Sequence, residues 1–337
     1  MLPMLPTLPM AQLRSILQCL PPRPWFRLGL LLLLALAAAA PARAAEPVVV
    51  VVISERSASY LEAAEVLVRE LELGAPERGG VARADIALMA AGEYAAAPPL
   101  APKLFIAVGA GASSLLAARE TRVPQIATLL PAASFEQIMQ ATGRRPSSVF
   151  SAVYLSQPLV RQFDLIRLAL PEARRVGVLL GADSQGQASA LQAAALSRGL
   201  ELASAQVGPG ETAYGALQKV LEDADLLLAV PSPQVYNSSS IQNILLSSYR
   251  ARVPFIGFSA SYVQAGAVFA VYSTPAMISR QTAVMARNLL MGRGLPIAPQ
   301  HPQEFSVSVN EQVARSLGLK LDAAALAERL RQLERTP

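Results

Sequence analysis

The sequence predicts an α/β protein whose parallel sheets form two doubly wound lobes joined by a hinge. Short apolar runs, typical of buried strands, alternate with helical patterns along residues 48–333. Small polar residues follow several of these runs, as they do at the carboxyl ends of parallel strands. The same strand-then-helix order occurs in both halves, with no low-complexity linker between them. Two such halves predict a cleft between two lobes, lined by strand ends from both sides.

The first half contains five expected strands and three expected helices. Residues 48–53 are rich in valine, which favours a buried strand, and residues 60–73 repeat apolar side chains at helical spacing. The strands are expected at residues 48–53, 85–89, 103–108, 124–129 and 149–154, and the helices at residues 60–73, 113–119 and 135–140.

The second half has the same alternation, with clearer helix ends. Pro171 ends one expected helix, and Gly199 and Gly292 follow two others. The strands are expected at residues 175–180, 201–207, 226–230, 254–258, 267–272 and 305–309. The helices are expected at residues 157–170, 188–198, 212–221, about 241–249, 275–291, 311–317 and 323–333.

Residues 1–45 have the layout of a secretory signal peptide. Three arginines precede an apolar run over residues 28–40, and Ala42-Arg43-Ala44 forms a small-x-small cleavage site. The run is shorter than the about 20 residues that span a bilayer. We expect cleavage near Ala44-Ala45 and a periplasmic protein. An uncleaved membrane anchor and a start at Met10 stay open as alternatives.

The leader also dominates the charge of the chain. The whole sequence has a net charge of +5 and a pI near 9.6. Without the four arginines of residues 1–45, 25 basic residues remain against 24 acidic ones. The pI is therefore no argument for nucleic-acid binding. The single cysteine, Cys19, lies in the leader, so the mature chain needs no disulfide.

The expected crossings between the lobes define the expected domains. The chain passes to the second lobe near residues 154–157 and returns near residues 264–266. The first lobe is then expected to comprise residues 46–154 and about 265–295. The second is expected to comprise residues 155–264 and about 296–337, including the C-terminal helices.

Several long segments of the second half resemble one known family. They are Ser156-Gln157-Pro158, LIRLALPEARRVGVLLG, DADLLLAVPSPQVYN, RARVPFIGFSASYVQAGAVFAVYSTP and FSVSVNEQVARSLGLKL. In order and spacing they resemble the ABC transporter substrate-binding protein family, of type I periplasmic-binding-protein-like fold, which includes exported receptors for aromatic amino acids. The first half is similar only in its strand-helix rhythm.

The resemblance implies a receptor that binds a small molecule, such as an amino acid or a related small organic solute. The receptor delivers this solute to an inner-membrane ABC permease, and we expect a monomer with no catalytic residue, cofactor or metal. Family members usually carry an acid before Pro131 and another after residues 226–230. Here Leu130 and Ser232 occupy these places, which predicts a cleft with less to pair with a ligand ammonium.

Four serines of the first half are candidate ligand contacts. Ser54 and Ser57 follow the first strand, and Ser113 and Ser114 follow the glycine-rich turn after the third. Backbone N–H groups at such a turn suit a carboxylate or phosphate. Ordinary helix capping is the alternative for all four side chains.

The second half adds polar candidates at three strand ends. Asp183, Ser184 and Gln185 follow the strand at residues 175–180, and Ser232 and Asn237 follow the strand at residues 226–230. Each side chain is expected to face the cleft. For residues 183–185 the alternative is an N-cap and a solvated loop, and for Ser232 and Asn237 it is a turn around two prolines.

The remaining candidates lie at or near the expected crossings. Ser259 follows the strand at residues 254–258, and Tyr154 and Tyr262 lie close to the two crossings. An aromatic ring there can stack on a flat ligand or pack the hinge. His301 is the only histidine, is expected at the surface, and supplies neither a metal site nor a catalytic triad.

Three other functions stay open. A periplasmic sensor or accessory protein would keep the fold with altered or lost ligand binding. An enzyme on the same fold would need a nucleophile, for which Ser113 and Ser184 are the candidates, but we expect no enzyme. A sugar-responsive repressor has the same architecture, but the leader and the lack of a helix-turn-helix before residue 48 argue against it.

Overall fold

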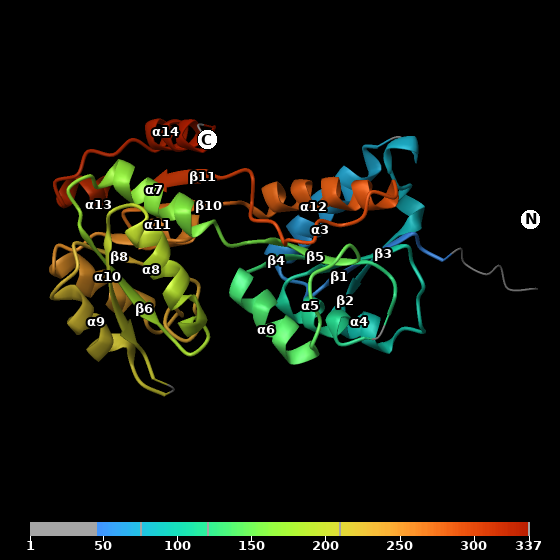
Figure 1. Cartoon of the computed structure of the whole chain (residues 1–337), viewed down its shortest axis with the longest axis horizontal. Helices are drawn as coiled ribbons and strands as arrows, with labels where there is room; N and C mark the ends of the chain where they lie inside the picture. Colours follow the sequence, from blue (N-terminus) through green and yellow to red (C-terminus); the bar gives the residue numbers. More distant parts are fainter. Residues whose placement is uncertain (1–45, 75, 120, 209, 336–337) are drawn as a thin grey trace, which may run out of the picture. The chain divides into compact units, whose positions relative to one another are not determined.

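The computed structural model describes residues 46–335, except residues 75, 120 and 209, and its first sheet is wholly parallel (Figure 1). The strand order is β2-β1-β3-β4-β5. The strands are β1 (Val49–Ile53), β2 (Ile86–Ala90), β3 (Leu104–Val108), β4 (Gln125–Leu130) and β5 (Phe150–Tyr154). The expected signal peptide, residues 1–45, lies outside the described residues.

Helices cover both faces of this sheet, which explains why its strands are apolar without interruption. α3 (Ala58–Glu72) and α12 (Pro275–Leu290) pack together on one face, against Val49, Val51 and Ile53 of β1. The other face is covered by α4 (Ala91–Ala96), α5 (Ala110–Ala117) and α6 (Ala132–Thr142) (Figure 1).

The second sheet is parallel except at one edge. Its order is β11-β10-β9-β8-β6-β7, and only the β10–β11 pair is antiparallel. The strands are β6 (Arg175–Leu180), β7 (Glu201–Gln206), β8 (Leu226–Leu228), β9 (Phe255–Gly257), β10 (Phe269–Tyr272) and β11 (Ser306–Val309).

Helices cover both faces of the second sheet as well. One core cluster joins β6 and β10 to α7 (Leu159–Ala169), α8 (Ala188–Leu196), α13 (Glu311–Ser316) and α14 (Ala323–Arg335). Another joins the opposite face to α9 (Ala213–Leu221), α10 (Ile241–Arg250) and α11 (Ala260–Ala265). Short 3₁₀ turns occupy Pro76–Arg78, Arg83–Asp85 and Gln185–Gln187. Alternating strands and helices thus confirm the predicted α/β class with two mostly parallel sheets.

Four helices differ from the sequence-based expectation. α4 and α11 were not predicted, because each has only six residues and too few turns to show a period. α5 and α6 begin three residues earlier than expected, at Ala110 and Ala132. Both extensions consist of small residues, which carry little apolar periodicity.

One expected lobe boundary needs correction. The return to the first lobe was expected near residues 264–266, which would place β10 in the first lobe. β10 instead pairs with β9 and β11 in the second sheet. The chain returns only after β10, and α12 then packs on the first sheet. The assignment of all other residues to two lobes stays a prediction.

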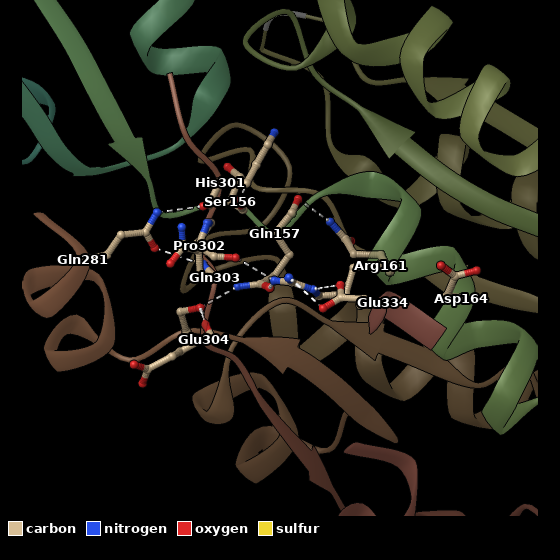
Figure 2. A network of polar contacts seen from close by, with 12 residues as sticks. Ser156, Gln157, Arg161, Asp164, Gln281, His301, Pro302, Gln303, Glu304 and Glu334 are labelled. Carbon is tan, nitrogen blue, oxygen red and sulfur yellow. Dashed lines mark hydrogen bonds and ion pairs between the residues drawn. The ribbon is translucent and has the colours of Figure 1, made fainter. Parts of the chain in front are cut away.

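Three chain segments that connect the two sheets lie side by side and are hydrogen-bonded together (Figure 2). Tyr154 N donates to Gln300 O at 2.8 Å, and Gln300 N donates to Ala152 O at 2.8 Å. Gln157 Nε2 donates to Ser273 Oγ at 2.8 Å, which joins the segment after β5 to the segment after β10. These contacts align the strand ends of both sheets along one junction.

Candidate ligand-binding site

A cavity of about 760 Å³ lies at the junction of the two sheets. Its walls come from the residues that follow β4 and β5 of the first sheet and β6, β8, β9 and β10 of the second. It therefore lies where the carboxyl ends of strands from both sheets meet, as the sequence predicts. Its volume falls in the range of small-molecule sites, about 300–1,000 Å³.

The second-sheet wall is built around the Asp183 carboxylate. Ser232 Oγ donates to Asp183 Oδ1 at 2.5 Å, and Gln234 N donates to Asp183 Oδ2 at 3.2 Å. Ala182 N donates to Gln234 Oε1 at 2.7 Å, which fixes the loop after β6 against the loop after β8. The structure thus brings together Asp183 and Ser232, two of the predicted site residues, and both line the cavity.

Three more predicted residues, Asn237, Ser259 and Tyr262, lie on the same wall. Asn237 Nδ2 donates to Pro233 O at 3.0 Å, so its amide mainly closes the turn before α10. Ser259 is the N-cap of α11, and its Oγ accepts from Tyr262 N at 3.5 Å. Capping by Ser259 fixes α11, which carries Tyr262.

Aromatic rings form the apolar part of this wall. The ring centroids of Phe258 and Tyr262 are 4.4 Å apart, and Tyr236 packs edge-on against Phe258 at 6.4 Å. Burial raises the pKa of Tyr262 and also that of Tyr236, so both phenols are neutral at pH 7. The Tyr236 side chain is 5% exposed, and its hydroxyl makes no hydrogen bond of normal geometry within the described residues. The Leu179 backbone lowers the pKa of Tyr236, but by less than burial raises it.

The first-sheet wall is the N-terminal part of α6. Leu129 has a φ of +56° where the register of β4 with β5 shifts, and this irregularity leads directly into Pro131 and α6. A left-handed leucine costs about 1–2 kcal/mol, and such backbone strain clusters at functional sites. Ala132 N donates to Ser156 Oγ at 3.1 Å, which ties the start of α6 to the segment after β5.

Beyond Ser134 in its first turn, α6 contributes the polar side chains of Glu136 and Gln137 to the cavity lining. Gln137 Nε2 donates to Asp183 O at 3.3 Å, so the two walls contact each other directly. The sequence-based prediction missed both residues because its candidates were taken from the segments that follow strands, and both residues lie within a helix. The sequence does contain one signal for Glu136, which is an acid in the first turns of a helix that follows a strand and Pro131.

His301 lies in the connecting segment before β11 (Figure 2). It also lines the cavity. Its Nδ1 is 2.9 Å from Ser156 O, and its ring packs edge-on against Tyr154 at 5.2 Å. Because a carbonyl oxygen can only accept, Nδ1 carries the proton, and Nε2 of the neutral ring is an acceptor. The side chain is exposed, as expected, but it was not predicted as a site residue.

The predicted serines of the first half do not line this cavity. Ser54 Oγ donates to Val108 O at 3.0 Å and accepts from Ala112 N at 2.9 Å, so it locks the turn between β3 and α5. Ser113 is buried and donates to Gly109 O at 2.7 Å. Ser57 stands at the N-cap of α3, and Ser114 is exposed on α5. For Ser54 and Ser113, the structure favours the turn and capping roles that were the alternative, whereas the Ser57 side chain makes no capping hydrogen bond.

Three further predicted residues also lie outside the cavity lining. Ser184 is fully buried and accepts from Gly181 N at 2.9 Å, while Gln185 is exposed in a 3₁₀ turn. Tyr154 is buried against Phe135, with a ring-centroid distance of 5.8 Å. Burial and, less strongly, the Glu136 carboxylate raise the pKa of Tyr154 to about 12. Tyr154 therefore packs the junction of the sheets, which was the alternative for this ring.

Residues 101–331 match the family of ABC transporter substrate binding proteins. The chain belongs to this family. It is a family of transport proteins and not a class of enzymes, and its members are normally extracytoplasmic. A search of curated proteins found no match.

Solved structures agree with this fold. The ligand-free, open structure of a substrate-binding protein with adhesive properties from Clostridium difficile is 15% identical. Its TM-score is 0.63, and the match covers 82% of this chain and 96% of that one. A conserved domain protein from Vibrio cholerae is 18% identical, with a TM-score of 0.58 and 83% and 97% coverage. An ABC domain from Streptococcus pneumonia in complex with L-Trp is 15% identical, with a TM-score of 0.54 and 82% and 97% coverage.

The described residues of this substrate-binding protein contain neither a candidate membrane span nor a candidate metal cluster. No described helix combines the length and the apolar character needed to cross a bilayer. No group of three or more His, Cys, Asp or Glu side chains within residues 46–335 is arranged to hold a metal ion.

Proposed function

We propose that this substrate-binding protein is an exported receptor that captures a small organic solute in the cavity between its two sheets. The observation that carries the proposal is the cavity itself, which combines a polar network around Asp183 with the rings of Phe258 and Tyr262. Such a combination of apolar walls and a few placed polar groups is typical of small-molecule sites. The ligand contacts we propose are Asp183, Ser232, Asn237, Ser259, Tyr262, Glu136 and His301.

The proposed partner is an inner-membrane ABC permease, which would receive the solute from the closed receptor. The two walls already contact each other through Gln137 and Asp183. A solute held between them would add contacts with both walls and favour their approach, as in hinge closure around ligands. We propose that the receptor acts as a monomer in the periplasm after removal of residues 1–45.

The test is thermal unfolding of the purified protein with a panel of amino acids, aromatic acids, amines and sugars. A ligand that binds the native state stabilises it by about 2.7 kcal/mol at 100 times its Kd. We therefore expect at least one aromatic solute to raise the Tm by several degrees. No shift across the whole panel would contradict the receptor role and favour a sensor or accessory protein that has lost its ligand.

A further inference from the structure

The charges that line the cavity are all of one sign. Glu136 and Asp183 are its two carboxylates, and the described lining contains no lysine or arginine. The sequence led us to expect few acids here, because Leu130 and Ser232 stand where acids are usual in the family. Besides Asp183, which was predicted as a ligand contact, the structure brings Glu136 of the other wall to the same cavity, so that each wall carries one acid.

Neither carboxylate is neutralised by a basic side chain. Within the described residues, no ion pair involves Glu136 or Asp183. Asp183 accepts from a hydroxyl and a backbone N–H, which are uncharged donors. Gln137 contacts the Asp183 backbone, and Glu136 is the residue before it on α6, so the two acids belong to facing walls that touch.

The positive ends of nearby helices offset the negative charge of the two carboxylates only in part. The N-terminal residues of α6, α7 and α8 line the cavity, and each of these helix ends supplies the equivalent of about half a positive charge. One of the backbone donors of α6, Ala132 N, is already bonded to Ser156 Oγ. The two full carboxylate charges outweigh these partial charges, so the electrostatic potential in the cavity remains negative. This potential favours a ligand that brings its own positive charge.

The neutral groups of the cavity suit the same kind of ligand. When its ring is uncharged, His301 offers an acceptor at Nε2, because Nδ1 then carries the proton that is donated to the Ser156 carbonyl. Phe258 and Tyr262 present ring surface, which attracts both flat apolar groups and cations.

We infer that the ligand carries a net positive charge: an organic ammonium attached to a flat apolar group, without a balancing carboxylate. The inference rests on the proposed receptor function and narrows its substrate class. The ammonium would lie between Glu136 and Asp183, and the apolar group against Phe258 and Tyr262. A zwitterionic amino acid or an aromatic acid would bring a carboxylate into a cavity whose described lining holds no lysine or arginine to receive it.

The experiment compares four solutes that have the same ring and differ in charge. They are tryptamine, neutral N-acetyltryptamine, zwitterionic L-tryptophan and anionic indole-3-propionate. The only tryptophan of the chain, Trp25, lies in the expected leader, so indole fluorescence of the solute reports binding directly. We expect tryptamine to bind at least about tenfold more tightly than each of the other three, because opposite charges a few ångströms apart attract strongly in a partly dry site.

Two variants test whether the preference for tryptamine depends on the carboxylate of Glu136. Glu136→Gln should weaken tryptamine binding about tenfold and leave N-acetyltryptamine unchanged, since only the charge is removed. Glu65→Gln, an exposed acid on α3 away from the cavity, should change neither affinity. Tighter binding of tryptophan or indole-3-propionate, or an unchanged tryptamine affinity in Glu136→Gln, would overturn the inference and leave the receptor function standing. No binding by these or any other solute would overturn both.

Discussion

Replacing Phe135 by alanine should lower the free energy of unfolding by about 3–5 kcal/mol. The Phe135 ring is 0% exposed and lies on the inner face of α6. It packs against Phe150 at a ring-centroid distance of 5.3 Å and against Tyr154 at 5.8 Å. The loss leaves a cavity beneath the helix that forms the first-sheet wall of the site. Urea denaturation followed by far-UV circular dichroism measures the change.

The same variant should also weaken ligand binding, because Glu136 and Gln137 follow Phe135 on α6. Phe135→Leu is the matched control. It keeps most of the apolar volume and should cost less than about 1.5 kcal/mol. Equal stability of Phe135→Ala and the unchanged protein would show that α6 is not held by this ring. An unchanged affinity for a bound solute would show that the first-sheet wall does not depend on it.

Replacing Arg161 by methionine should destabilise the protein by about 3 kcal/mol, because several polar groups lose their partner at once. Arg161 is 6% exposed, and its guanidinium pairs with both carboxylate oxygens of Glu334 on α14. Its Nη1 also donates to Gln157 Oε1 at 2.7 Å and to Pro302 O at 2.8 Å (Figure 2). The guanidinium lies over the Phe305 ring as well, 4.5 Å from its centroid. One side chain thus joins α7, α14 and two of the connecting segments.

An exposed ion pair provides the control for Arg161. Arg315 pairs with Glu311 at 3.1 Å on the surface of α13, and both side chains are exposed. Arg315→Met should change stability by less than about 0.5 kcal/mol, since exposed helix pairs contribute little. Denaturation of the two variants under identical conditions compares them. A loss of under 1 kcal/mol for Arg161→Met would contradict the structural role given to its network.

Most of the strands and helices could be predicted, because apolar runs, helical periodicity and helix-ending glycines can be seen in the sequence. Strands such as β1 are buried on both faces, so Val49–Ile53 reads as an unbroken apolar run. The long helices show their period, and glycine marks several of their ends. The place where the chain recrosses after β10 could not be predicted, because pairing between distant strands decides which sheet a strand joins.

Part of the cavity lining could be predicted from the sequence, for a related reason. Asp183, Ser232, Asn237, Ser259 and Tyr262 follow strands of the second sheet, and that position alone placed them on the cavity. Ser54 and Ser113 also follow strands, but their hydroxyls are used within the turn between β3 and α5. Nothing in the sequence distinguishes a serine that closes a turn from one that faces a ligand. Glu136 and His301 reach the cavity from a helix and from a connecting segment, which strand ends do not predict.

The central claim is that a solute binds between the two sheets, in the cavity that α6 and the loops after β6, β8 and β9 enclose. Isothermal titration of an Ala133→Trp variant with a solute that stabilises the unchanged protein tests it most directly. Ala133 lines the cavity, so an indole there should fill the site and weaken binding by about 100-fold or more, which corresponds to about 2.8 kcal/mol. Ala193→Trp, at an exposed position of α8 outside the cavity, should bind normally. Unchanged affinity in Ala133→Trp would contradict the claim.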